Sequence, residues 1–127
     1  MILAASQLQV DVDIAENLQC QIVLEAANGP LDIKADSICQ DREIPVIPDI
    51  LANGGGVQTS YYEMLQHMEG ENPEHYNSNE KVLGLLQDKM VTTSDRVMNY
   101  SEQHRVTLRE AAYVLALQKL ETAYMKV

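Results

Sequence analysis

Two short polar turns, each directly after an apolar run, hold the residues of this sequence that are best suited to chemistry. The first reads Ala-Asn-Gly-Pro at residues 27–30, and the second reads Asn-Gly-Gly-Gly-Val at residues 53–57. In open α/β sheets, ligands bind beyond the carboxyl ends of the strands, where turns of this kind lie. The two turns therefore predict a ligand site built from asparagine side chains and glycine backbone.

The chemistry of each turn has a functional and a purely structural interpretation. Asn28 could hydrogen-bond a ribose or a nicotinamide carboxamide, and the same residues also suit a tight turn with unusual φ angles. The three glycines admit a close ligand and precede a predicted helix whose first N–H groups could hold a carboxylate. Ser60, expected in the first turn of that helix, could join this anion site. A flexible linker, with Ser60 as an ordinary capping residue, is the alternative.

Short apolar runs bounded by turn residues predict the elements that position these turns. In chain order we expect strand 2–5, helix 11–17, strand 21–24, helix 31–42 and strand 44–47. Strands that alternate with helices at this spacing imply a parallel sheet with right-handed crossovers. The first half of the chain is therefore predicted to be α/β, with a parallel sheet of about three strands.

The second half is predicted to be helical. Apolar residues at helical spacing indicate helices at 57–67 and 79–104, separated by a break at 69–73. Thr107 and Glu110 form a capping-box pattern at the start of a final helix. A parallel sheet needs cover on both faces, and the helical tail could cover one of them. Since only two short helices lie between the strands, we expect instead that part of the apolar surface packs against something outside this chain.

Composition excludes several classes of function. The formal net charge is −10, which disfavours nucleic acid and anionic membrane surfaces as partners. Cys20 and Cys39 have no metal-ligand spacing, so we expect free thiols in a reducing compartment and no metal site. The N-terminus does not resemble a signal peptide, and no run is long enough for a membrane helix.

Three ordered stretches resemble the glutamate dehydrogenase family, which includes leucine, phenylalanine and valine dehydrogenases. They read IVLEAANGPLDIKAD, IPVIPDILANGGGVQTSYYEMLQ and RVTLREAAYVLALQKLETAY. They are similar to its Asn-Gly-Pro turn, its Pro-Asp to Gly-Gly-Val stretch and its closing Arg-x-Ala-Ala-Tyr helix. The resemblance implies a partial Rossmann-like sheet followed by a C-terminal helical tail.

The resemblance also implies roles for individual residues. It places Asn28 and Asn53 near the nicotinamide, and Ala4 and Ala5 on a strand end close to the cofactor. It places Val57 in the pocket for the substrate side chain and Ser60 at a substrate carboxylate. The implied cofactor is NAD or NADP, and the implied substrates of the complete enzyme are L-glutamate and 2-oxoglutarate. A cytoplasmic homo-hexamer is expected, or a mitochondrial one if the complete protein carries a transit peptide.

Parts of the family's machinery have no counterpart in these residues. The family's active-site Lys and Asp and its glycine fingerprint for the pyrophosphate are not matched, so no catalytic residue is assigned. Residues 1–56 resemble the second half of the cofactor domain, and residues 57–127 resemble helices that pack on a substrate domain. We therefore expect a C-terminal portion that is inactive alone. A non-catalytic chain that docks on full-length subunits, or a remnant that barely folds, are the alternatives.

Overall fold

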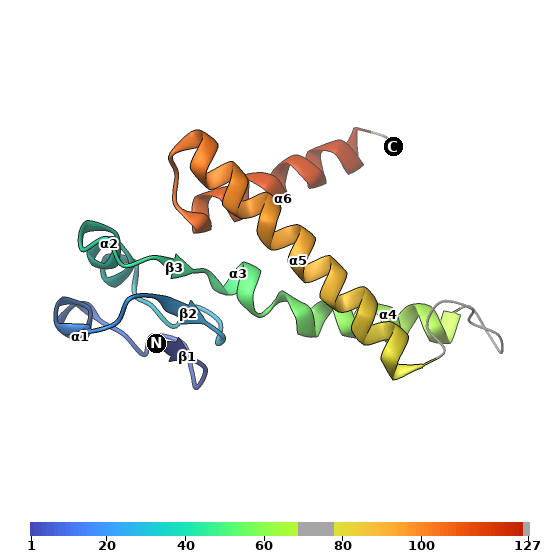
Figure 1. Ribbon diagram of the computed structural model, residues 1–127, viewed down its shortest axis with the longest axis horizontal. Coiled ribbons are helices and arrows are strands. Elements are labelled where there is room, and N and C mark those ends of the chain that lie inside the picture. Colours follow the sequence, from blue (N-terminus) through green and yellow to red (C-terminus); the bar gives the residue numbers. More distant parts are fainter. Residues whose placement is uncertain (69–77, 126–127) are drawn as a thin grey trace.

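The computed structural model describes residues 1–68 and 78–125, so the predicted break at 69–73 lies outside the described part. Short strands alternate with helices in the first half, and longer helices follow in the second (Figure 1). In chain order the elements are β1 (Ile2–Leu3), α1 (Val12–Asn17), β2 (Val23–Glu25), α2 (Ile33–Asp41), β3 (Val46–Ile47), α3 (Asp49–Ala52), α4 (Gly54–Met68), α5 (Asn79–His104) and α6 (Leu108–Tyr124).

The strands form one parallel sheet in the order β1-β2-β3, which confirms the predicted α/β architecture. Strand β1 is shorter than predicted, because the carbonyl of Leu3 accepts hydrogen bonds from the backbone N–H groups of both Ala26 and Ala27 and ends the pairing. Since the strands run in the same direction, their carboxyl ends lie along one edge of the sheet. The turns that carry the candidate residues therefore share that edge.

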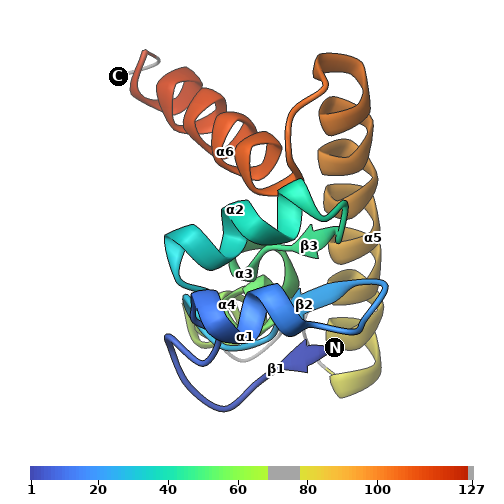
Figure 2. The same ribbon diagram turned by 90° about the vertical axis from the view of Figure 1, so that its left-hand side faces the viewer.

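Two hydrophobic cores pack against opposite faces of the sheet. Successive strand residues point to opposite faces, so Val46 packs in the first core and Ile47 packs in the second. The first core lies against α1 and α2, and its buried members are Leu3, Val10, Ala15, Leu18, Val23, Leu31, Ala35, Cys39 and Ile44. The second core joins α3, α5 and α6 through the buried residues Leu51, Val97, Ala111 and Ala112. Helix α6 contacts β3 (Figure 2).

Both cysteines are free thiols, and Cys39 is fully buried in the first core. Burial away from water disfavours the thiolate and raises the pKa of Cys39, and the carboxylate of Asp36 adds to this. We expect iodoacetamide at pH 8 to label the half-buried Cys20 well before Cys39, because the thiolate is the reacting species. Mass spectrometry of the labelled chain measures both rates, with Cys20→Ser as the control that isolates Cys39. Equal rates at the two thiols would contradict this burial.

The raised pKa of Cys39 also sets the direction of a pH dependence. As pH rises past the ordinary thiol value, the unfolded chain loses its Cys39 proton before the folded chain does. The unfolded state then binds fewer protons, so this thiol lowers the free energy of unfolding as pH rises. Below the ordinary thiol pKa, the contribution of the protonated thiol is fully present.

Helix starts follow local capping chemistry. The side chains of Asp11, Asp32, Ser78 and Thr107 each accept a hydrogen bond from a backbone N–H in the first turn of the helix that follows. The capping box predicted at Thr107 is present in both directions, because Glu110 also accepts from the Thr107 backbone N–H. Capping by Asp32 starts α2 at Ile33, two residues later than the sequence predicts.

The second glycine turn differs from the prediction. Helix α4 begins at Gly54, so the three glycines form its first turn instead of preceding it. Asn53 ends α3 with φ near −100°, and its carbonyl accepts a hydrogen bond from Gly56, so the chain passes from one helix almost directly into the next. Glycine tolerates this helical geometry despite its low helix propensity. As a consequence, Ser60 lies in the second turn of α4.

Exposed apolar stripes run along two helices. In α4 the stripe consists of Val57, Tyr61, Met64 and Met68, and in α6 it consists of Tyr113, Leu117, Leu120 and Tyr124. Both follow the same i, i+4, i+7, i+11 spacing, which places each set on one helix face. Their side chains are between 48% and 80% exposed. We call these the α4 stripe and the α6 stripe.

In the described part of the chain, every helix is too short or too polar to cross a membrane.

Candidate functional site

The two asparagines singled out in the sequence lie together at the carboxyl edge of the sheet. The side-chain nitrogen of Asn53 donates a hydrogen bond to the side-chain oxygen of Asn28 at 2.7 Å. Asn28 follows β2, and Asn53 follows α3, which itself follows β3, so the parallel topology brings the two turns into contact. Neither the amide nitrogen of Asn28 nor the amide oxygen of Asn53 has a hydrogen-bond partner among the described residues. The pair thus offers one donor group and one acceptor.

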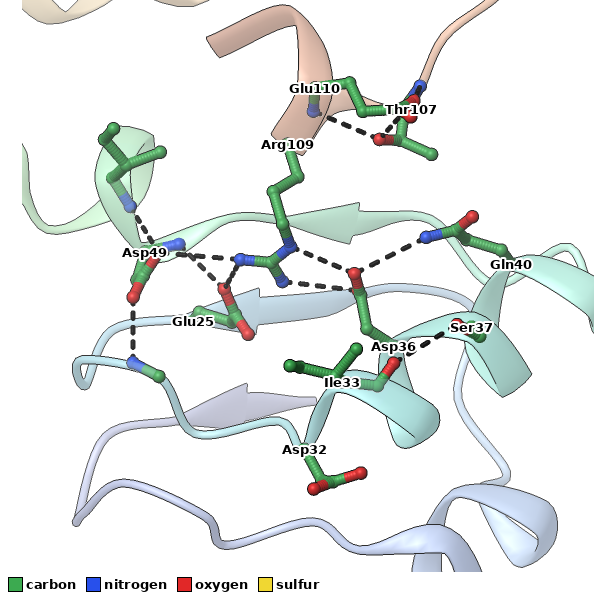
Figure 3. Close-up of polar contacts among 12 residues, drawn as sticks. Glu25, Asp32, Ile33, Asp36, Ser37, Gln40, Asp49, Thr107, Arg109 and Glu110 are labelled. Atoms are coloured by element: carbon green, nitrogen blue, oxygen red, sulfur yellow. Dashed lines mark hydrogen bonds and ion pairs between the residues drawn. The ribbon is translucent and has the colours of Figure 1, made fainter. Parts of the chain in front are cut away.

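A cluster of charged residues surrounds the guanidinium of Arg109 (Figure 3). Nη1 of Arg109 lies 3.0 Å from Oε2 of Glu25, and Nε lies 3.0 Å from Oδ2 of Asp36. Nη2 donates to the other oxygen of Asp36 at 3.3 Å, so the guanidinium grips that carboxylate in a fork. Asp49 lies 3.6 Å from Nη1. One cation near the start of α6 therefore holds carboxylates from β2, α2 and α3.

Burial sets the electrostatics of this cluster. The Glu25 side chain is 1% exposed, and its Oε1 atom has no hydrogen-bond partner among the described residues. Burial by itself lowers the pKa of Arg109, but the hydrogen bonds to Glu25 and Asp36 outweigh it and raise that pKa above its ordinary value. The guanidinium is therefore a permanent positive charge beside a buried carboxylate.

Asp49 connects the charged cluster to the asparagine pair. Its Oδ2 accepts a hydrogen bond from the backbone N–H of Gly29 at 2.8 Å, and its own N–H donates to Oε2 of Glu25 at 2.8 Å. Its carbonyl accepts from the N–H of Asn53 at 3.0 Å. Gly29 has a φ of +53°, a backbone conformation that residues other than glycine rarely adopt. Asp49 thus contacts both candidate turns.

The other residues predicted from the sequence lie around this edge without contacting the pair. Val57 and Ser60 are exposed in the first and second turns of α4, and Val57 begins the α4 stripe. Ala4 and Ala5 are exposed just beyond β1, where the N–H of Ala5 donates to the side chain of Gln9. The structure therefore joins the asparagines directly and places the remaining residues on open surface.

Sequence reasoning missed the charged cluster. It assigned no role to the acidic residues of this cluster, although Glu25 is buried and Asp36 and Asp49 are largely covered. One signal in the sequence pointed to a buried charge. Glu25 comes directly after apolar residues at the end of β2, where a charge is costly unless it is paired. The identity of its partner, 84 positions away in Arg109, depends on the tertiary fold.

Two further observations bound the chemistry of the site. No grouping of His, Cys, Asp and Glu side chains in residues 1–68 and 78–125 could hold a metal ion. A cavity of about 260 Å³ lies between α3, α4, α5 and α6, with Leu51, Met90 and Val97 in its lining, and it includes none of the predicted site residues. The asparagine pair therefore lies on an open edge instead of in this cavity.

The chain is similar in sequence to curated glutamate dehydrogenases. The chain is 39% identical over 116 residues to the catabolic NAD-specific glutamate dehydrogenase RocG of Bacillus subtilis, covering 91% of this chain and 26% of RocG. It is 36% identical to the NADP-specific glutamate dehydrogenase A1 of Halobacterium salinarum, over 95% of this chain and 28% of that protein. The relatives therefore include both NAD-specific and NADP-specific enzymes.

A solved structure shows the same fold. The chain superposes on the hetero-hexameric glutamate dehydrogenase from Thermus thermophilus in its Leu-bound form with a TM-score of 0.86 and 32% identity. The match covers 96% of this chain and 28% of that chain, so this chain spans between a quarter and a third of the length of these three proteins. The family model for Glutamate/Leucine/Phenylalanine/Valine dehydrogenase matches residues 1–127. This chain is a member of the glutamate/leucine/phenylalanine/valine dehydrogenase family.

Proposed function

We propose that this chain supplies one wall of the active site of an NAD(P)-dependent glutamate dehydrogenase, in which L-glutamate is oxidatively deaminated to 2-oxoglutarate and ammonia. The observation that carries the proposal is the Asn28–Asn53 pair at the carboxyl edge of the sheet. When bound, the nicotinamide accepts the hydride from the substrate. The residues of this chain bind and orient the two molecules.

The asparagine pair fits a carboxamide. After their mutual hydrogen bond, Asn28 retains N–H donors and Asn53 retains a carbonyl acceptor within the described part of the chain. A carboxamide offers one carbonyl acceptor and one NH₂ donor, so the two groups complement each other. Ala4 and Ala5 lie exposed just beyond the neighbouring strand β1, and their small side chains would let the nicotinamide ring approach this edge. This fit is the same for NAD and NADP, because the two cofactors share the nicotinamide.

The substrate would lie against α4. Ser60 and Val57 are three residues apart in this helix, so their side chains share one face. The Ser60 hydroxyl would donate a hydrogen bond to a substrate carboxylate, and Val57 would line the pocket for the substrate side chain. The exposed positions of both residues leave them free for these contacts.

The same proposal assigns the two halves of the chain to different domains of the complete enzyme. Residues 1–56 would form the second half of a Rossmann-like cofactor domain, and the helices of residues 57–127 would pack on a substrate domain. The α4 stripe and the α6 stripe support this division, since exposed apolar side chains at regular spacing indicate a covering partner. We infer that the complete enzyme is a hexamer.

The isolated chain should show no turnover with glutamate and NAD or NADP. Hydride transfer needs cofactor and substrate held face to face and a group that moves the proton. Lys34, the lysine closest to the asparagine turns in sequence, is exposed on α2 and has no contact with the pair. Absorbance at the NADH band during incubation with both cofactors measures turnover. Steady-state product formation by the purified chain would contradict the expectation.

A chimera tests the proposal directly. In the RocG chimera, this chain replaces the segment of RocG that it matches. We expect the chimera to oxidise glutamate, and Asn53→Ala within it to raise the KM for the cofactor on the order of tenfold, as loss of one hydrogen bond predicts. Asn99→Ala on α5, an exposed asparagine far along that helix, is the control. An inactive but folded chimera would overturn the proposal.

A non-catalytic role is the second candidate, favoured by the two exposed apolar stripes. In that case the chain would dock on full-length dehydrogenase subunits and modulate them. Mixing the chain with full-length RocG and separating the species by size-exclusion chromatography distinguishes the two. A stable complex that changes RocG activity would favour docking, and a clean separation would count against it.

A further inference from the structure

Among the described residues that lie outside the two asparagine turns, Asp49 is the one whose own atoms bond to both turns. Its carboxylate accepts from Gly29 next to Asn28, and its carbonyl accepts from the N–H of Asn53 itself. Since the first turn follows β2 and the second follows α3, a shared partner fixes their separation. The 2.7 Å contact between the asparagine side chains depends on that separation.

Asp49 is in turn held from α6. Arg109 contacts both Asp49 and Glu25, and Oε2 of Glu25 accepts the backbone N–H of Asp49 at 2.8 Å. The fork between Arg109 and Asp36 keeps the guanidinium plane in place, because two parallel hydrogen bonds define an orientation as well as a distance. Polar contacts therefore run from Arg109 on α6 to Asp49 (Figure 3). From Asp49 they continue to Gly29 in the first turn and to the backbone N–H of Asn53 in the second.

We propose that Asp49 and Arg109 are positioning residues for the Asn28–Asn53 pair, acting through Gly29 and Glu25 and without touching cofactor or substrate. The consequence for the enzyme rests on the proposed function, since it requires the pair to bind the nicotinamide carboxamide. Displacement of a binding group by about 1 Å can cost two orders of magnitude in rate. Arg109 lies in α6, the helix that also carries the α6 stripe, so a partner that covers this stripe contacts the helix that holds Asp49.

The geometric part is tested in the 127-residue chain by NMR of the asparagine side-chain NH₂ groups. Asp49→Ala removes the acceptor for Gly29, whereas Asp49→Asn retains a carbonyl oxygen that can accept the same bond. We expect Asp49→Ala to shift the NH₂ signals of Asn28 and Asn53, and Asp49→Asn to leave them close to wild type. Asp88→Ala, an exposed acidic position on α5, is the control. Unchanged signals in Asp49→Ala would overturn the positioning role.

Arg109→Lys is a second variant in case Asp49→Ala does not fold. Lysine keeps the positive charge but cannot reproduce the fork on Asp36. We expect it to shift the same two NH₂ signals while the backbone spectrum of α1 stays in place. The matched control is Arg96→Lys on α5, an exposed arginine without an ion pair in the described residues. A backbone spectrum perturbed throughout, with unmoved NH₂ signals, would overturn the proposal.

The kinetic part uses the RocG chimera. Asp49→Ala should raise the KM for NAD on the order of tenfold, with Asp49→Asn restoring most of it, because misplaced asparagines bind the carboxamide poorly. The KM for glutamate should change little, which a general loss of structure would not produce. Shifted NH₂ signals with an inactive wild-type chimera would defeat the proposed function and leave the positioning of the asparagines standing. An active chimera unaffected by Asp49→Ala would defeat the positioning role.

Discussion

Replacing Arg109 by Met is expected to lower the free energy of unfolding by about 3 kcal/mol, because it leaves the buried Glu25 carboxylate without its cation. Glu25 is 1% exposed, so water cannot take the place of the guanidinium. Met retains the length and apolar character of the arginine stem, which limits the loss of packing. Urea unfolding followed by circular dichroism measures the change. A loss below about 1 kcal/mol would show that the cluster contributes little to stability.

Two variants separate the charge effect from other causes. Arg96→Met removes an exposed arginine on α5 and should change stability by no more than about 0.5 kcal/mol. Glu25→Gln combined with Arg109→Met removes both charges, and it should recover a substantial part of the lost stability, because an uncharged buried amide costs less than an unpaired carboxylate. If the double variant is as unstable as Arg109→Met alone, the penalty does not come from the buried charge.

Ser60→Ala in the RocG chimera is expected to lower kcat/KM for glutamate by about tenfold to a hundredfold, which corresponds to the loss of one hydrogen bond to a charged group. The hydroxyl is exposed on the second turn of α4 and would be the donor to a substrate carboxylate. The KM for NAD should stay near its starting value, since the asparagine pair is untouched. Steady-state kinetics with each substrate varied in turn measures the two effects separately.

Two control variants test whether the Ser60 hydroxyl itself causes the effect. Ser60→Thr keeps the hydroxyl and should retain most of the activity. Ser37→Ala removes an exposed helical serine whose hydroxyl bonds within α2, so it should leave the kinetics unchanged. Full activity in Ser60→Ala would remove this serine from the proposed site, and equal losses in Ser60→Ala and Ser37→Ala would indicate an effect on folding instead of on binding.

The starts of the helices show which features of the fold local sequence can predict. Thr107 and Glu110 predict a capping box, and the structure has it, because both partners are within one turn of each other. The start of α4 was predicted at Val57, but it lies at Gly54. The weak helix propensity of the three glycines is overridden there by tertiary context, since α3 leads straight into the helix. Helix α5 also approaches closely, because a Cβ at Gly55 would lie 3.7 Å from the side chains of Leu86 and Met90.

For the candidate site, too, the sequence predicts one part and the packing decides the other. Asn28 and Asn53 are recognisable because each follows an apolar run in a glycine-bearing turn, and parallel strands place such turns on one edge. Their direct contact at 2.7 Å requires the sheet order and α3, which brings the second turn back over the first. The sequence could predict the shared edge, and the hydrogen bond depends on the packing.

The sequence by itself determined the parallel α/β half, the helical half, the two asparagine turns and the resemblance to the dehydrogenase family, because all four are written in local patterns and their order. The tertiary structure alone decided that Arg109 pairs with Glu25, and that Asp49 links this pair to both turns. Apart from the bond between Asp49 and Asn53, these contacts join residues separated by 20 to 84 positions. Local periodicity contains no information about such partners, since burial and pairing arise only when distant elements pack together.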